Sequence, residues 1–281
     1  MSYSRIKSYA KINLALNITG KTSKLHKIES VVGFVTLHDV ILIKKIQSKK
    51  HIISFKGKFS KNIDPKNTIS KLFKFLEKEK LLTSSKFEIK VNKYIPSKSG
   101  LGGGSMNAAN ILKYLVEKKI IRIKKKNIVE ICNLIGSDVI LGFNSKSSIL
   151  TSKNQIKYFK NCQKFYTLVV KPNYGCSTKE VYSKVKKFNR SKLNKPKKYM
   201  FDPLFLKKMN NSLEPIVFSK YSSLRLIKLY LEKLINPFLV RMSGSGSSLV
   251  AYYQSKNRCE NAKNEFKKRY KNYWCIVSKT I

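Results

Sequence analysis

Long apolar runs and paired cysteines are both missing from the 281-residue sequence. No apolar stretch approaches the roughly 18 residues of a membrane span, and the N-terminal residues alternate polar and apolar side chains where a signal peptide would have a continuous apolar core. The cysteines show no C-x-x-C spacing, which is typical of buried thiols in a reducing compartment; they are Cys132, Cys162, Cys176, Cys259 and Cys275. We therefore expect a cytoplasmic protein without a membrane partner.

Acidic residues and arginines are also scarce. There are 15 acidic against 59 basic residues, a formal net charge of +44, and 52 of the basic residues are lysines spread along the chain. Arginine is the residue that reads guanine and stacks on bases, so its scarcity argues against a specific nucleic-acid partner. The lysines instead predict a solvated basic surface, produced by an AT-rich coding bias, that adheres to polyanions only at low salt.

The hydrophobic content of 42%, with fifteen Tyr and fifteen Phe, excludes a disordered chain. Period-two alternation at residues 12–18 predicts a strand with one buried face, so that Lys11 and Asn13 point the same way. Further patterns predict strands at residues 31–37, 39–46, 51–55, 87–91, 165–172, 247–253 and 273–278, and helices at residues 67–82, 126–135, 221–234 and 257–270. This mixture is typical of an α+β protein.

Two segments are polar and rich in lysine. Residues 144–164 are the best boundary candidate, and they divide the chain into an N-terminal domain of residues 1–155 and a C-terminal domain of residues 156–281. The basic stretch at residues 184–200 is interpreted as an exposed loop or insertion.

Four of the twelve glycines, at positions 100, 102, 103 and 104, fall within five residues and lead into a helical pattern at residues 108–115. A glycine loop that opens a helix presents free N–H groups and the positive end of the helix dipole, which favour a phosphate. The stretch is not a Walker A loop, does not complete G-x-G-x-x-G, and is not accompanied by protein-kinase signatures. By itself it is equally compatible with a tight connection.

Two other places carry constrained chemistry. Asp138 is one of only four aspartates and has apolar neighbours, so its carboxylate is either held by a cation or caps the next turn. Residues 241–248 place Gly244 and Gly246 in a serine-rich turn before a strand, where backbone amides can pack against a second polar group.

These features resemble the GHMP kinases, the family of galacto-, homoserine, mevalonate and phosphomevalonate kinases. The resemblance covers nearly the whole chain in collinear order, at residues 10–14, 96–107, 135–139, 210–215 and 241–248. It implies a two-domain α+β fold, with an N-terminal nucleotide domain like the second domain of ribosomal protein S5, a ferredoxin-like C-terminal α/β sandwich, and an active site in the cleft between them.

The resemblance also implies roles for individual residues. Asp138 would take the proton of the acceptor hydroxyl, with Lys11 beside it, and Asn67 would begin the nucleotide-base pocket. The loop that would wrap the β- and γ-phosphates of ATP comprises Pro96, Ser97, Lys98, Ser99, Gly100, Leu101, Gly102, Gly103, Gly104, Ser105 and Met106, with Ser105 also a candidate contact for Mg²⁺. The acceptor would be bound by Asn13, His26, Thr178, Tyr182, Ser243 and Gly244.

Within the family, the resemblance points to the branch whose acceptor is a small molecule, a cytidine-diphosphate-linked methylerythritol, and to a monomer or weak homodimer. His26 would face the cytosine, although its pattern alone favours a surface imidazole, and Tyr182 is equally interpretable as a core tyrosine. Leu25 stands where the family usually has an aromatic. Two alternatives therefore stay open: a kinase for homoserine or a mevalonate-type alcohol, and an inactive polyanion-binding relative.

Overall fold

The structure is a computed structural model that describes residues 2–23 and 25–281. The chain forms two compact units that are interleaved along the sequence. Unit 1 comprises Met1–Lys11, Leu37–Ser97 and Gly102–Ser145, and unit 2 comprises Ile12–Thr36, Lys98–Leu101 and Lys146–Ile281. The strands β1 (Ser4–Lys21) and β2 (His26–Ile46) therefore contribute residues to both units. The boundary at residue 155 concerns the family's sequence domains and stays a prediction.

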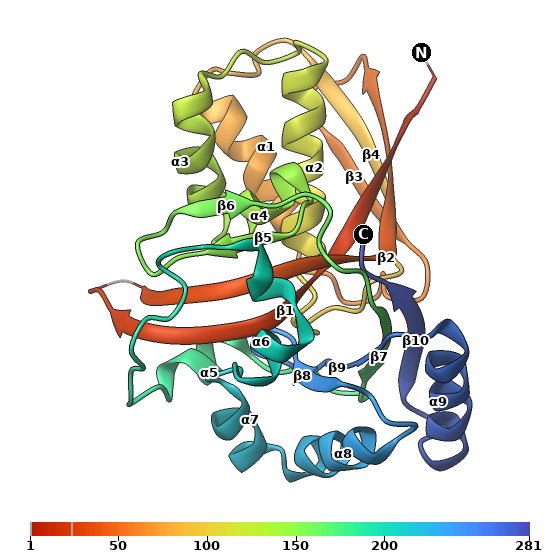
Figure 1. Cartoon of the computed structure of the whole chain (residues 1–281). Helices are drawn as coiled ribbons and strands as arrows, with labels where there is room; N and C mark the ends of the chain where they lie inside the picture. The colour runs from red at the N-terminus through yellow and green to blue at the C-terminus, as the bar shows by residue number, and fades with distance from the viewer. Residues whose placement is uncertain (1, 24) are drawn as a thin grey trace. The chain divides into compact units, whose positions relative to one another are not determined.

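Unit 1 is a sheet covered by helices. β2 pairs with β4 (Lys86–Asn92) in antiparallel fashion, with Ile43 opposite Ile89, and β4 pairs with β3 (Ile52–Lys56) in parallel fashion. Helices lie on one face of these strands (Figure 1). They are α1 (Thr68–Lys78), α2 (Gly103–Glu117) and α3 (Lys125–Ile135), followed by the short α4 (Val139–Asn144). Alternate strand residues and one stripe of each long helix form a single apolar core.

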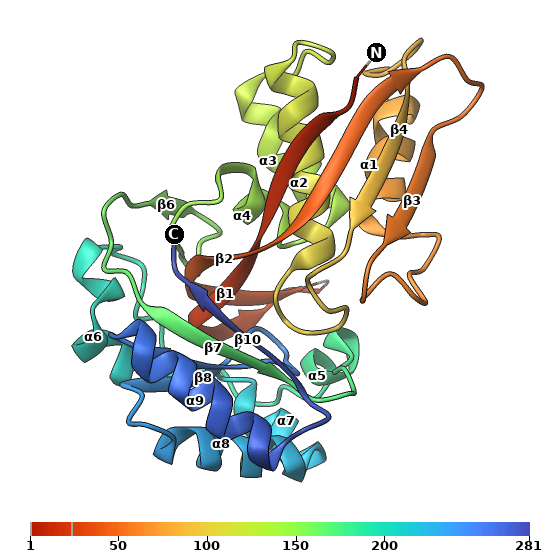
Figure 2. The ribbon, with the colours of Figure 1, turned by 90° about the vertical axis from the view of Figure 1, so that its right-hand side faces the viewer.

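Unit 2 is built on a four-stranded antiparallel sheet in the order β10-β7-β9-β8. Its strands are β7 (Tyr166–Lys171), β8 (Leu239–Met242), β9 (Leu249–Tyr253) and β10 (Trp274–Lys279). The helices α8 (Ser222–Lys233) and α9 (Lys256–Arg269) pack on one face of this sheet (Figure 2). Leu16 and Ile18 of β1 join the same core.

Shorter elements complete unit 2. β2 pairs at Ser30 with β5 (Ser148–Leu150), which continues to β6 (Ile156–Tyr158). The remaining elements are α5 (Thr178–Ser183), a 3₁₀ helix η1 (Lys198–Phe201), α6 (Pro203–Lys207) and α7 (Glu214–Lys220).

The α+β prediction is confirmed, and each long periodic pattern forms the expected type of element, although β1 begins at Ser4, well before the pattern at residues 12–18. The strands expected at residues 31–37 and 39–46 are one continuous strand, β2. The basic stretch at residues 184–200 differs from a simple exposed loop, because Leu193 and Met200 are buried and the segment ends in η1. The high lysine content of this segment predicted exposure and gave no sign that these two apolar side chains would be buried.

All five cysteines are free thiols. Cys132, Cys176 and Cys259 are buried as expected, whereas Cys162 and Cys275 are half-buried. Burial raises the pKa of Cys132 and Cys259 to about 12. Across the described part of the chain, the helices are all too short or too polar to cross a membrane.

Candidate active site

The glycine-rich start of α2 is shaped by its neighbours in unit 1. Gly102 is the N-cap residue and has a φ of 69°, and a β-carbon at this position would lie 2.8 Å from Cγ of Lys11. Only glycine combines this backbone conformation with passage of the lysine stem. A β-carbon on Gly103 would likewise lie 3.0 Å from Ile95, and one on Gly104 would lie 3.1 Å from the Thr68 hydroxyl.

No side chain caps the N-terminus of α2. The N–H groups of its first turn therefore have no capping partner of the usual kind, and the helix dipole adds positive potential at the same end. The N-terminus of this 15-residue helix therefore has the features of an anion-binding site. The stem of Lys11 packs across its N-cap residue.

Lys11 and Asp138 form an ion pair in unit 1, with 3.1 Å between Nζ and Oδ2. The Lys11 side chain is 4% exposed, whereas that of Asp138 is 31% exposed. Asp138 occupies the N-cap position of α4 but makes no side-chain cap bond. The sequence left two roles open for this carboxylate, pairing with a cation or capping the next turn, and the structure shows the pairing with a cation. The carboxylate keeps a face that a ligand could reach.

Ser105 lies close to the turn that carries Asp138. A β-carbon on Gly136 would lie 3.9 Å from the Ser105 hydroxyl oxygen. Met106 has a different position, because its side chain is buried against Gly142 and its N–H donates to the Gly102 carbonyl. Met106 therefore fixes the turn through packing, while the Ser105 hydroxyl lies beside Gly136, in the turn that leads to Asp138.

A buried carboxylate, Asp39, fastens both sides of the glycine stretch in unit 1. Its Oδ1 accepts hydrogen bonds from the N–H groups of Tyr94 (2.8 Å) and Ile95 (2.9 Å), just before the stretch. Its Oδ2 accepts from Asn107 Nδ2 at 2.9 Å, in the first turns of α2, and from the Lys93 ammonium. Asp39 is fully buried. One side chain thus sets the spacing between the strand end and the helix start.

The earlier half of the glycine stretch belongs to unit 2, where it packs on the serine-rich turn. A β-carbon on Gly100, whose φ is 76°, would lie 1.9 Å from the Ser243 carbonyl oxygen. The Ser243 hydroxyl donates to the Gly100 carbonyl at 2.9 Å, and the Ser248 N–H donates to the Ser99 carbonyl at 3.1 Å. The turn thus holds a second polar backbone segment, as its sequence suggested.

The other loop residues divide by exposure. Pro96, Ser99 and Leu101 are buried, whereas Ser97 and Lys98 are exposed. The Lys98 backbone packs closely on Gly175, where a β-carbon would lie 2.9 Å from the Lys98 carbonyl oxygen. The exposed pair is therefore available to a ligand, and the buried residues shape the loop.

Asn67 has a capping function in the structure. Its side-chain oxygen accepts hydrogen bonds from the N–H groups of Ile69 (2.9 Å) and Ser70 (3.2 Å) at the start of α1. Its amide nitrogen donates to the Asp64 carbonyl at 3.0 Å. Its role toward the nucleotide base stays a prediction.

Three predicted acceptor residues meet in unit 2 around the serine-rich turn. The Asn13 N–H donates to the Ser243 hydroxyl at 3.2 Å, and a β-carbon on Gly244 would lie 3.5 Å from the Asn13 side-chain oxygen. Asn13 also donates from Nδ2 to the Ser30 hydroxyl at 2.8 Å. Its amide is therefore fixed in orientation beside Gly244.

Thr178, His26 and Tyr182 form a second group of predicted acceptor residues in unit 2. The Thr178 hydroxyl is 2.9 Å from the Ser245 hydroxyl at the serine-rich turn. The rings of His26 and Tyr182 have centroids 5.3 Å apart. Burial, reinforced by the positive charge of Lys21, lowers the pKa of His26. The imidazole is therefore neutral at neutral pH.

Sequence reasoning assigned no role to several buried polar residues that hold these segments. Asn211 donates to the carbonyls of Met242 and Gly244, both at 2.8 Å, and Glu214 accepts from the Met242 N–H at 2.7 Å. Asp39 and Glu29 are also buried carboxylates that accept hydrogen bonds from other segments of the chain. The sequence offered one signal for them, the small number of acidic residues, because each carboxylate in a chain of net charge +44 is surrounded by potential cationic partners.

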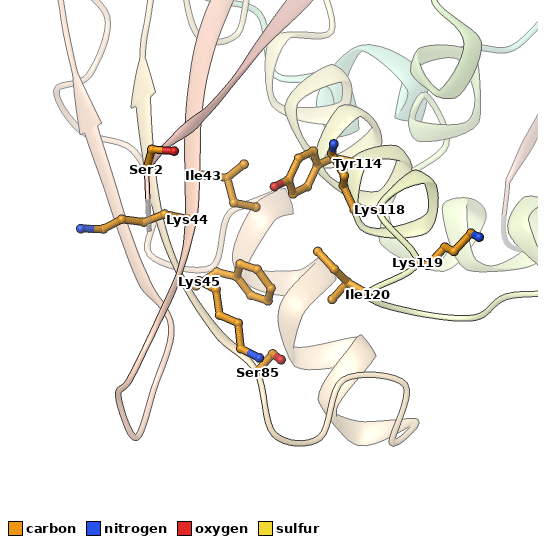
Figure 3. Close-up of a pocket in the computed structure, with 10 residues that line it drawn as sticks. Ser2, Ile43, Lys44, Lys45, Ser85, Tyr114, Lys118, Lys119 and Ile120 are labelled. Carbon is orange, nitrogen blue, oxygen red and sulfur yellow. The ribbon is translucent and has the colours of Figure 1, made fainter.

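A cavity of about 340 Å³ in unit 1 lies away from these residues. Its lining includes Ile43, Phe87 and Ile120 together with four lysines, Lys44, Lys45, Lys118 and Lys119. The ammonium groups of Lys44 and Lys119 point away from one another and out of the hollow (Figure 3). The lysines therefore do not converge on an anion, and the cavity is not a candidate phosphate site.

Known proteins match both the sequence and the fold. Residues 67–148, which include α1, the start of α2 and Asp138, match the GHMP kinases N terminal domain. The chain is 55% identical, over 281 residues and 100% of both chains, to a protein of Pelagibacter ubique (strain HTCC1062) named 4-diphosphocytidyl-2-C-methyl-D-erythritol kinase. The chain belongs to the GHMP kinase family. As a member of that family it is an ATP-dependent phosphotransferase.

Solved structures of GHMP kinases share the fold. A crystal structure of 4-(cytidine 5'-diphospho)-2C-methyl-D-erythritol kinase matches with a TM-score of 0.77 at 18% identity, covering 99% of this chain and 100% of that one. A homoserine kinase from Cytophaga hutchinsonii matches with a TM-score of 0.70 at 15% identity, covering 100% and 95%. These matches establish the GHMP kinase fold.

Proposed function

We propose that the chain transfers the γ-phosphoryl group of ATP to the 2-hydroxyl of 4-diphosphocytidyl-2-C-methyl-D-erythritol, a step in non-mevalonate isoprenoid precursor synthesis. The observation that carries the proposal is the 3.1 Å contact of Lys11 with Asp138, next to the uncapped start of α2. Its support for this acceptor is the 55% identity, over the full length of both chains, to the Pelagibacter ubique kinase of that name.

The reaction requires positioned phosphates, charge neutralisation and an acceptor for the hydroxyl proton. Asp138 accepts that proton as the acceptor oxygen bonds to the γ-phosphorus and the bond to the ADP oxygen breaks. The ammonium of Lys11, 3.1 Å from Asp138 Oδ2, holds the carboxylate in position and stabilises negative charge on the attacking oxygen. The products are ADP and the 2-phosphate.

The phosphates of ATP are held at the N-terminus of α2. The N–H groups from Gly103 to Ser105 and the helix dipole supply the positive potential. A divalent cation that is bound mainly by phosphate oxygens and water needs only one or two protein oxygens, and the Ser105 hydroxyl beside the Asp138 turn fits that need. Mg²⁺, when bound there, neutralises charge on the β- and γ-phosphates.

The direct test is ADP release from purified protein with 4-diphosphocytidyl-2-C-methyl-D-erythritol. Asp138→Asn should lower kcat by roughly 10²- to 10⁴-fold, because the proton acceptor is lost. Asp202→Asn is the matched control, since Asp202 is exposed and occupies the N-cap position of α6 without a side-chain cap bond. Absence of turnover by the wild-type protein would refute this function. Undiminished turnover by Asp138→Asn would refute this role of Asp138.

The acceptor needs a separate test because Leu25, an aliphatic residue, is 67% exposed near the predicted acceptor residues. Homoserine and mevalonate are compared with the cytidine-linked acceptor in the same assay. A site for cytidine diphosphate should also give inhibition by CDP. Turnover of homoserine or mevalonate without CDP inhibition would favour the other acceptor class.

A further inference from the structure

Lys171, the last residue of β7, is a buried lysine. Its side chain is 9% exposed, and its Nζ donates to the carbonyls of Pro172 and Tyr174, both at 2.9 Å. Among the described residues no carboxylate pairs with this ammonium, and burial lowers its pKa. A buried charge without a counter-charge costs free energy, so an apolar side chain would serve better if the position only had to fill space. The ammonium therefore indicates that the segment it holds, residues 172–176, must keep one conformation.

Tyr174 fastens the same segment to other parts of unit 2. Its carbonyl also accepts from the Ser247 hydroxyl, at 2.7 Å, in the serine-rich turn. Its own hydroxyl is 2.6 Å from the Ser223 hydroxyl of α8, and its ring stacks on that of Tyr221 with centroids 5.2 Å apart. The 172–176 segment is thus fixed at both its backbone and its largest side chain.

The next residue, Gly175, packs on Lys98 of the glycine stretch. A β-carbon on Gly175 would lie 2.5 Å from Cβ of Lys98 and 2.9 Å from its carbonyl oxygen. Lys98 has a φ of 49°, in the left-handed region that is unfavourable for residues other than glycine. Such a conformation persists only where neighbouring structure holds it. Because the Lys98 side chain is exposed, the packing on Gly175 sets the direction in which it leaves the loop.

We propose that Lys171 is a positioning residue for the phosphates of ATP, and that it acts through the 172–176 segment on Lys98. The inference rests on the proposed function and deepens it. A lysine whose backbone is already held in its binding conformation loses less conformational entropy when its ammonium meets a phosphate. Lys171 supplies that restraint from inside unit 2, by fixing the carbonyls on either side of residue 173.

The kinetic test uses Lys171→Met, which keeps an unbranched apolar stem and removes the ammonium. KM for ATP should rise by roughly 2- to 10-fold, the equivalent of one lost hydrogen bond. The value of kcat should stay unchanged, because a phosphate contact made before and during transfer stabilises both states alike. Lys267→Met is the matched control, since Lys267 on α9 also donates to two carbonyls, those of Lys271 (3.0 Å) and Tyr273 (2.6 Å).

Two further variants test the route from Lys171 to Lys98. Lys98→Ala removes the side chain through which Lys171 acts, so adding Lys171→Met to it should cause no further rise in KM for ATP. Gly175→Ala leaves the ammonium of Lys171 intact and displaces Lys98 directly, so it should raise KM for ATP by itself. It also keeps the proposal testable if Lys171→Met fails to fold.

A binding measurement separates this proposal from the proposed function. Calorimetry with the non-hydrolysable ATP analogue AMP-PNP and Mg²⁺ should show weaker binding by Lys171→Met than by the wild type and Lys267→Met. That result in a protein without turnover would overturn the proposed function and support the role of Lys171. Turnover by the wild type, with equal AMP-PNP affinity in Lys171→Met, would overturn the role of Lys171 alone. Equal weakening in Lys267→Met, or additive effects of Lys98→Ala and Lys171→Met, would also overturn that role.

Discussion

The stem of Lys11 occupies the space that a side chain on Gly102 would need: a β-carbon there would lie 2.8 Å from Lys11 Cγ and 3.2 Å from its Cε. The residue that begins α2 thus also sets the course of the lysine whose ammonium meets Asp138. The start of α2 and the Lys11–Asp138 ion pair are therefore coupled. A larger side chain at Gly102 should displace Lys11 and so change the rate of the reaction.

Gly102→Ala is therefore expected to lower kcat by roughly 10- to 100-fold, because the ammonium is displaced from Asp138. The positive φ should also cost about 1–2 kcal/mol of stability. Steady-state kinetics and urea unfolding measure the two effects. Gly20→Ala is the control, since its β-carbon would lie 3.6 Å from the nearest atom and its φ is not positive. Normal kcat in Gly102→Ala would contradict the coupling.

The second prediction concerns the buried pair of Asp39 and Lys93. Asp39→Asn leaves a buried ammonium without its counter-charge and should lower the free energy of unfolding by about 3–5 kcal/mol. The double variant Asp39→Asn with Lys93→Met should recover part of that loss, because the stranded charge is gone. Urea midpoints of the single and double variants test this. A double variant less stable than Asp39→Asn alone would contradict the explanation.

The acceptor site should respond to acid through His26. Because burial and Lys21 lower its pKa, protonation of His26 occurs below its usual value of 6.5, and kcat/KM for the acceptor should fall as the pH drops through that lower range. Lys21→Met removes one of the two causes, so the acid limb should move to higher pH. Lys27→Met, on the same hairpin, should leave the limb in place. A limb that is identical in all three proteins would remove His26 from acceptor binding.

Stability should also depend on pH through His51 in unit 1. Burial lowers its pKa, with Glu77 opposing that shift, and its Nδ1 accepts the Phe87 N–H at 3.1 Å. Since the folded pKa lies below 6.5, the unfolded chain binds more protons in that window, and this contribution to stability is complete above about pH 6.5 and declines below it. The stability difference between the wild type and His51→Gln should shrink from pH 7.5 to pH 5. A constant difference would refute the prediction.

Local patterns predicted most of the fold because alternation and helical periodicity report burial directly. The strand at residues 12–18 and the amphipathic α1 are examples. Short elements such as α5, with six residues, contain too few turns to show a period. The meeting of Lys11 with Asp138 was expected only through the family resemblance, since it depends on tertiary pairing.

The residues that sequence reasoning missed share one property. Asp39 and Glu29 are each fully buried and accept four hydrogen bonds from segments distant in the chain. Nothing in the local sequence around a carboxylate specifies such partners.

Each unit has a buried thiol in its core that can report when that core opens. Cys132 belongs to the core of unit 1 and Cys259 to that of unit 2, and both are fully shielded. With pKa values raised to about 12, neither forms the thiolate that alkylating reagents attack while its core stays closed. Pulsed alkylation read out by peptide mass spectrometry should therefore time the opening of the two cores independently, and adding ATP should slow only the openings that nucleotide binding opposes.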